Sequence, residues 1–159
     1  MSRRLWWLVL GCCAVTAGAC QRELTLPGAA DLEGVYGEAA RVRLNGNVVE
    51  VIVQQPREHL ERGGRLWAQV GPYVYLFTPQ TRDIFQKYTG VAAVRAITRM
   101  PGAGEIARAT LVRDTLNDYT WPRAFELAAE ARRSGSEDPK AVYDFVRWAE
   151  RYTDFQYRY

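Results

Sequence analysis

The sequence predicts an α+β domain: a mainly antiparallel sheet of about six strands, one inserted helix, and a C-terminal helical hairpin packed on the sheet. Three observations lead to this fold class. Short β-rich runs bounded by turn residues recur through residues 39–113. An Asn-Gly pair and a Pro-Gly-Ala-Gly segment each join two such runs, as in β-hairpins. From residue 121 onwards the apolar residues recur every three or four positions, which is typical of helices.

The first hairpin is expected around Asn45-Gly46, between two β-rich runs in residues 39–54. Asn-Gly is typical of a type I′ turn, because both central residues of that turn need a positive φ. With this pair as the turn, one face of the hairpin is apolar and the other carries a cross-strand ion pair. The expected partners are Val42 with Val49, Ala40 with Val51, and Arg41 with Glu50.

Two further strands are expected in the middle of the chain. Residues 57–62 could form one helical turn before them. The runs 65–70 and 73–77 contain aromatic and β-branched residues, which favour strands. Gly71-Pro72 would then form the turn between these two strands.

An inserted helix and a second hairpin follow. Thr78-Pro79 is typical of a helix start, because Thr caps the first turn and Pro fits the first helical position. Gly90 would end this helix. The runs 91–99 and 105–113 predict two strands joined by a longer loop. The apolar face of the helix would be formed by Ile84, Phe85 and Tyr88.

Two helices are expected at the C-terminus. Residues 121–133 form the first, and Asp138-Pro139 begins the second after a short loop, so the two should be antiparallel. Because Phe155, Tyr157 and Tyr159 also alternate, the last residues could instead be extended. The apolar stripe of the second helix comprises Val142, Phe145, Trp148, Tyr152, Phe155 and Tyr159.

The first twenty residues have the pattern of an export signal. Arg3 and Arg4 precede a mostly apolar, uncharged stretch, residues 5–16, and small residues follow at 17–19. This order is typical of a secretory signal peptide. The apolar stretch is shorter than the roughly 20 residues that a membrane-spanning helix needs.

The segment Ala17-Gly18-Ala19-Cys20 resembles the lipobox of bacterial lipoproteins, although Leu is more usual than Ala at its first position. The resemblance implies that the Cys20 thiol receives a diacylglycerol, that the chain is cut before Cys20, and that the new amino terminus is acylated. Three fatty chains, palmitate among them, would hold the protein firmly, since one chain alone anchors only marginally. Under this reading, residues 1–19 are the signal peptide, 20–33 the lipidated N-terminus and tether, and 34–159 a single domain.

Other processing routes stay open. An ordinary signal peptidase would cut the same bond and release a secreted protein, and a cut before Cys12 would leave a shorter leader. Cys12 and Cys13 would be removed with the leader, which leaves Cys20 as the single cysteine of the exported chain. An unpaired cysteine in an exported protein needs an explanation, and lipidation provides one. Arg3-Arg4 also resembles the twin-arginine export motif. In the lipoprotein family, Asp after the cysteine favours retention in the inner membrane, so Gln21 predicts the outer membrane, facing the periplasm.

Residues 21–33 are interrupted by Pro27 and Gly28 and show no apolar period, so they could tether the domain. Fully extended, a dozen residues reach about 40 Å. Packing of Leu24 and Leu26 onto the domain is the alternative.

The mature chain has 19 basic and 18 acidic residues after removal of Arg3 and Arg4 from the total. Because the charges nearly balance and nothing in the sequence indicates Lys and Arg clustered on one face, we predict no nucleic-acid partner.

No catalytic residue, metal ligand set or cofactor motif is predicted. Ser134 and Ser136 fall in the turn between the C-terminal helices, and His59 stands alone. Asp114 and Asp118 bracket a loop that lacks the alternating ligands and the glycine of a calcium site. The chain has neither Gly-rich phosphate motif.

Aromatic residues give the sharpest binding hypothesis. If Val74 and Leu76 point inward, Trp67, Tyr73 and Tyr75 could form an exposed surface for a small ligand or a glycan. The leading hypothesis is nevertheless a non-enzymatic lipoprotein that binds or scaffolds other envelope proteins, because an anchor is present and catalytic groups are lacking. A hydrolase without a familiar motif is the third.

Overall fold

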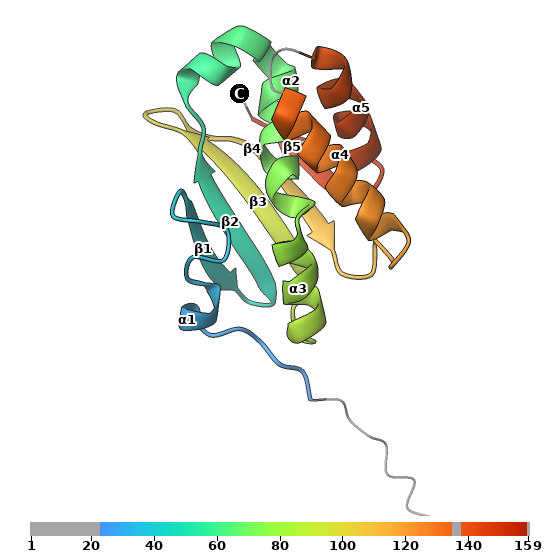
Figure 1. Cartoon of the computed structure of the whole chain (residues 1–159). Helices are drawn as coiled ribbons and strands as arrows, with labels where there is room; N and C mark the ends of the chain where they lie inside the picture. Colours follow the sequence, from blue (N-terminus) through green and yellow to red (C-terminus); the bar gives the residue numbers. More distant parts are fainter. Residues whose placement is uncertain (1–22, 135–137, 159) are drawn as a thin grey trace, which may run out of the picture.

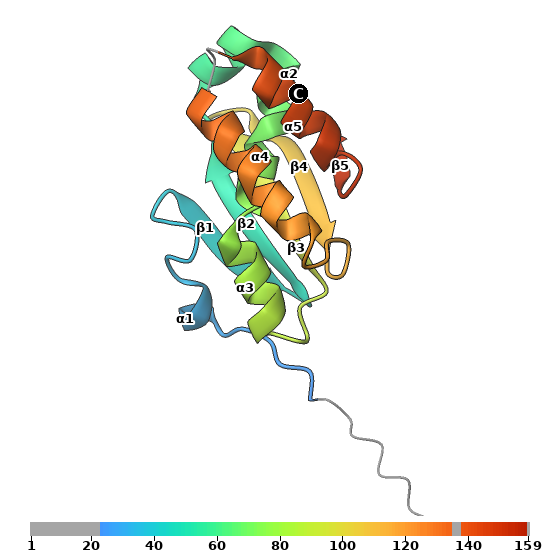
Figure 2. The same cartoon turned by 45° about the vertical axis from the view of Figure 1, so that its right-hand side comes forward.

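The computed structural model describes residues 23–134 and 138–158, and this part of the chain forms an α+β fold with one five-stranded sheet and five helices. Helices α2 to α5 gather on one side of the sheet (Figures 1 and 2). The strands are β1 (Ala40–Asn45), β2 (Val48–Gln54), β3 (Ala93–Met100), β4 (Gly104–Val112) and β5 (Asp154–Tyr157). The helices are α1 (Ala29–Leu32), α2 (Arg57–Leu76), α3 (Pro79–Lys87), α4 (Thr120–Ser134) and α5 (Pro139–Ala149).

The strands follow one another across the sheet in chain order. Three of the four pairings are antiparallel, and β2 pairs with β3 in parallel. Parallel neighbours need a crossover connection, which α2 and α3 supply here. The predicted α+β class is therefore confirmed, while the expected number of strands was too high by one.

The first hairpin forms, but its register differs from the predicted one. Asn45 pairs with Val48, so Gly46 and Asn47 are the two central residues of the turn. Gly46 has a φ of 62°, whereas Asn47 does not have a positive φ, which fits a II′ turn with glycine first. The shift is an even number of residues, so each side chain keeps its predicted face. The observed partners are Val42 with Val51, Ala40 with Val53, and Arg43 with Glu50.

Residues 65–76 belong to α2 and Phe77 is its C-cap, so the two strands predicted over 65–77 are wrong. Four apolar residues recur at helical spacing along this segment, and they pack against the core. Gly71-Pro72 lies inside α2 instead of forming a turn. A break does occur earlier, at Gly64, whose φ of 54° interrupts the helix at a conformation that favours glycine. The four residues are Leu66, Val70, Tyr73 and Phe77.

Local signals placed α3, α4 and α5 correctly, whereas the short helix α1 was not predicted. Thr78 caps α3 by accepting from the Thr81 backbone N–H, and Asp138 caps α5 in the same manner. α5 ends at Ala149, so the helical stripe predicted to continue towards Tyr159 is wrong beyond that point. The alternative of an extended C-terminus is confirmed by β5, which pairs with β4.

The core lies between the sheet and the helices. Valine and alanine side chains from β2, β3 and β4 cover the helix-facing side of the sheet. Small side chains let α2 approach closely, and a cluster of aromatic rings then joins α2 to α5 and β5. Ring centroids in this cluster lie 5.1–6.2 Å apart. Its members are Tyr73, Phe77, Phe145, Trp148 and Phe155.

Candidate functional site

The sheet face opposite the helices carries a row of arginines. Within the described residues, no helix covers this face (Figures 1 and 2). The pairing registers bring outward-facing side chains from all five strands into one surface, which we call the arginine face. It contains Arg41, Arg43, Arg95, Arg99, Arg108 and Arg158, with the acids Glu50, Glu105 and Asp154.

Each of two acids on this face is held between two arginines. Glu50 lies 2.7 Å from the Arg43 guanidinium and 3.4 Å from that of Arg95, and its side chain is only 5% exposed. Asn45 donates a further hydrogen bond to Glu50, at 3.1 Å. Glu105 likewise accepts from Arg108 and lies 3.6 Å from Arg158 Nε. Both carboxylates are therefore already occupied by arginines of the same chain.

The environment of Glu50 holds its carboxyl group ionised. Burial alone would raise its pKa, but the hydrogen bonds from Asn45 and Arg43 and the charges of Arg43 and Arg95 outweigh burial and lower it. Arg41 and Arg99, in contrast, make no ion pair or side-chain hydrogen bond with the described residues. The arginine face thus presents unneutralised positive charge around fixed acidic centres.

Apolar side chains lie among these arginines. Ile97 on β3 lies beside Ile52 on β2 and opposite Arg108 on β4, and Ile97 is buried although none of the described helices covers it. The aliphatic stems of long arginine side chains can cover such residues while their heads stay in water. A mixed surface of this kind, apolar at the centre and charged around it, resembles protein-binding surfaces.

The second candidate is a cavity of about 350 Å³ between α2, α4 and the ends of β2 and β3, which we call the aromatic cavity. Trp67 and Tyr75 line it, as two of the three aromatic residues expected to bind a ligand. Arg132 of α4 also lines it and donates a hydrogen bond to the Val74 carbonyl. Burial lowers the pKa of the Arg132 guanidinium below its ordinary value.

Gln55 forms part of the wall of this cavity and fixes α2 against the sheet. Its Nε2 donates to the Trp67 carbonyl at 3.2 Å, and its Oε1 has no hydrogen-bond partner among the described residues. That oxygen lies against Gly71, where a side chain would collide with it. The cavity therefore depends on a glycine at this position of α2.

Tyr73, the third aromatic residue of the predicted site, lies elsewhere. It is fully buried and does not line the cavity, and its ring packs against those of Phe77, Phe145 and Phe155. Burial raises the pKa of its hydroxyl to about 12. The prediction assumed a strand, in which residues two apart share a face, whereas in a helix they do not. Tyr73 is therefore a core residue, and its assignment to a ligand site is wrong.

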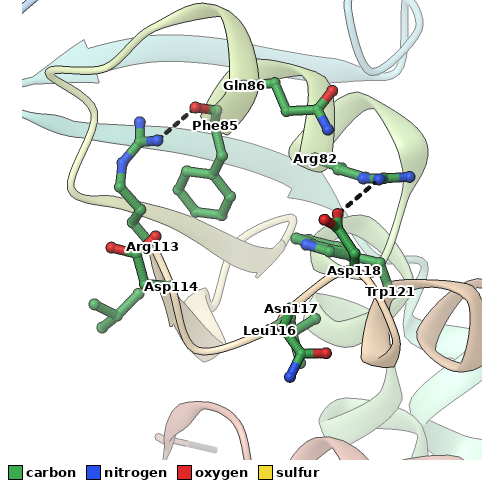
Figure 3. Close-up of a pocket in the computed structure, with 10 residues that line it drawn as sticks. Arg82, Phe85, Gln86, Arg113, Asp114, Leu116, Asn117, Asp118 and Trp121 are labelled. Atoms are coloured by element: carbon green, nitrogen blue, oxygen red, sulfur yellow. Dashed lines mark hydrogen bonds and ion pairs between the residues drawn. The ribbon is translucent and has the colours of Figure 1, made fainter.

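A third candidate, the polar cavity, also has a volume of about 350 Å³ and lies between α3, the end of β4 and the start of α4 (Figure 3). On one side Arg82 pairs with Asp118 at 3.0 Å. On the other, Arg113 lies over the Phe85 ring and donates to three backbone carbonyls at the end of α3 and in the following loop. Sequence reasoning considered only the aspartates of this loop. Because the Arg113 guanidinium already donates to backbone carbonyls at the end of α3 and in the loop after it, we assign the polar cavity a structural role.

Catalytic groups do not converge in the described part of the chain. No three residues among its histidines, cysteines, aspartates and glutamates are placed to hold a metal ion. Ser134 bonds to Glu130 at 3.1 Å within α4. His59 lies in α2, but its side chain is outside the described part, as are Ser136 and the predicted lipidation residue Cys20.

No protein family, curated protein or solved structure matches this chain. Among the described helices, none combines the length and apolar character needed to cross a bilayer. Functional reasoning therefore rests on the surfaces of this structure and on the sequence.

Proposed function

We propose that this chain is a lipid-anchored envelope protein, held at the outer membrane through Cys20 and facing the periplasm, that binds other proteins without catalysis. Its docking surface is the arginine face, and its partner presents an acidic protein surface. The observation that carries this proposal is the net positive charge of a sheet face that the described helices leave uncovered. Six arginines meet three acids on it, which leaves a net charge of +3.

The internal ion pairs of this face favour a protein partner with acids at defined positions. Arg43, Arg95 and Arg108 are fixed by their carboxylates, so little side-chain freedom is lost on binding. Arg41 and Arg99 remain for bidentate pairing with a partner's carboxylates, a geometry that arginine provides and lysine does not. Charge complementarity of this kind gives specificity and fast association.

Photo-crosslinking in intact cells tests the proposal. A photoreactive amino acid at Ile52 or Thr110 on the arginine face is expected to give a discrete protein adduct, whereas the same group at Tyr143 on α5 gives none. The double variant Arg41→Glu/Arg99→Glu should abolish the adduct, and Arg41→Lys/Arg99→Lys, which keeps the charge, should retain part of it. Adducts that survive charge reversal, or that contain lipid instead of protein, would show that the proposed partner is wrong.

The aromatic cavity favours a second function, the binding of a small ligand or glycan. Its size is within the range of ligand pockets, about 300–1,000 Å³, and it combines apolar walls with few polar groups. We propose it as the alternative, with Trp67 and Tyr75 as the stacking residues and Arg132 at the opening. Titration with 1-naphthoate and with a soluble chito-oligosaccharide, followed by tryptophan fluorescence, tests it. Saturable binding that Tyr75→Ala removes and Tyr143→Ala retains is expected; equal responses of both variants would contradict it.

A further inference from the structure

The N-terminal segment of the described chain is fastened to the end of the domain. Thr25 and Thr89, which lies in the turn after α3, exchange hydrogen bonds in both directions, from Thr25 N to Thr89 Oγ1 at 3.1 Å and from Thr89 N to Thr25 Oγ1 at 3.2 Å. The Thr25 carbonyl also accepts from Gly90 N at 2.8 Å, and the Glu23 carbonyl accepts from Thr89 Oγ1. The expected free tether over residues 20–33 is therefore attached to the fold from residue 23 onwards.

Two leucines on either side of this attachment keep exposed apolar surface. Leu24 is 73% exposed, whereas Leu26 is 46% exposed and its side chain lies against Gly90, so of the two leucines that could pack onto the domain Leu26 does so in part. Leu24 and the exposed part of Leu26 therefore leave apolar surface on either side of Thr25.

The position of these leucines along the chain indicates what they contact. Four peptide units separate Cys20 from Leu24, which places their Cα atoms at most about 14 Å apart whatever the conformation between them. The headgroup region of a bilayer is itself roughly 5–8 Å thick on each side. With fatty chains on Cys20, the two leucines are within reach of the lipid surface, and no long tether separates the domain from it.

We propose that Leu24 and Leu26 insert into the membrane interface and that the end of the domain formed by α1 and the end of α3 faces the bilayer. The inference rests on the lipidation of Cys20 in the proposed function. Exposed leucines are costly in water and gain free energy when they enter an apolar phase. The occupant of this surface is therefore lipid, and the anchored domain is held in one orientation instead of swinging freely.

Vesicle binding of the mature chain, residues 20–159, provides the test. Coupling Cys20, its single thiol, to a maleimide with one fatty chain gives an anchor that alone binds only marginally, so added contacts become measurable. Leu24→Ser/Leu26→Ser is expected to weaken binding to neutral phosphatidylcholine vesicles by about tenfold or more. Tyr143→Ser, which removes a side chain that is 51% exposed on α5, should bind as the wild type does. α5 lies away from the N-terminal segment in both views (Figures 1 and 2).

Equal vesicle binding of the leucine variant and the wild type would overturn the inference. A circular dichroism melt of each variant verifies that the fold is retained, which the exposure of both leucines leads us to expect. Since the lipid is attached chemically, this result does not depend on whether cells lipidate Cys20. The proposed function fails separately, if the N-terminal peptide isolated from cells carries no lipid.

Discussion

Gly71→Ala tests how closely α2 lies on the sheet beside the aromatic cavity. A Cβ atom at this position would lie 2.9 Å from Gln55 Oε1 and 3.0 Å from Thr98 Cγ2. Since optimal carbon contacts lie at about 3.5–4.0 Å, the helix or these side chains must move. Overpacking costs about 1–3 kcal/mol, whereas alanine in place of a helical glycine gains about 1 kcal/mol. We therefore expect the unfolding free energy to fall by about 1 kcal/mol.

Urea denaturation of residues 20–159, followed by tryptophan fluorescence, measures this change. Ala129→Gly in α4 isolates the helix-propensity contribution and should cost about 1 kcal/mol. Combining Gly71→Ala with Gln55→Ala removes the nearest oxygen, so the double variant should lose about 1 kcal/mol less than the two single changes added together. Two results together would refute the close packing. In the first, Gly71→Ala raises the unfolding free energy by the full value of about 1 kcal/mol expected from helix propensity. In the second, the effects of Gly71→Ala and Gln55→Ala on this free energy simply add in the double variant.

Three further predictions concern the core, the arginine face and the end of α3. Tyr73→Phe removes a buried hydroxyl that has no hydrogen-bond partner among the described residues, so stability at neutral pH should stay equal or rise, while Tyr73→Ala should lose about 3–5 kcal/mol. Because the pKa of Tyr73 is raised to about 12, the stability of the wild type should fall above pH 10 more steeply than that of the phenylalanine variant, in melts recorded across that range. Glu50→Gln should destabilise by about 1–3 kcal/mol at pH 7. The Glu50 pKa is lowered in the fold, so this difference should shrink as the pH falls below the ordinary value of 4.5; a constant difference in acid melts would argue against an ionised Glu50. Arg113→Met should lower the unfolding free energy measured by urea denaturation by about 2–3 kcal/mol, because the hydrogen bonds to three carbonyls are lost. Arg113→Lys should restore only part of this stability, because lysine lacks the forked guanidinium. If Arg113→Lys were as stable as the wild type, the forked geometry would not matter.

Elements defined by local chemistry were predictable from the sequence. Thr78-Pro79 and Asp138-Pro139 begin helices because their capping hydrogen bonds need only residues within the same turn. The failure over residues 65–77 has a different origin: Tyr73, Tyr75 and Phe77 alternate as a strand would, while the wider apolar spacing is helical. Tertiary packing onto the sheet decided in favour of the helix.

One misassigned segment had consequences for the topology. With 65–77 predicted as two strands, the sequence predicted successive antiparallel hairpins, whereas the helical connection through α2 and α3 makes β2 and β3 parallel neighbours. The hairpin register failed for a smaller reason, since Gly46 occupies the first central position of the turn and Asn47 the second. Both errors concern how elements join, which short-range patterns describe poorly.

The candidate sites, too, were predictable where one segment carries the signal and not where separate strands combine to form it. Trp67 and Tyr75 were singled out for their chemistry and do line a cavity, although on a helix instead of strands. The arginine face was missed because its members come from separate strands, and no basic run exists in the sequence. The alternation of Arg41 with Arg43 was its visible signal. The premise that basic residues do not cluster is wrong for this face, and the absence of a nucleic-acid partner stays a prediction.

The mass of the N-terminal peptide of the mature protein, isolated from cell membranes, tests the central claim most directly. Both the envelope partner and the membrane contact of Leu24 and Leu26 depend on a lipid at Cys20. We predict a peptide that begins at Cys20 and carries a diacylglycerol thioether with an additional acyl chain on its amine. A peptide that begins at Cys20 with a free thiol, from protein recovered in the soluble fraction, would contradict the account.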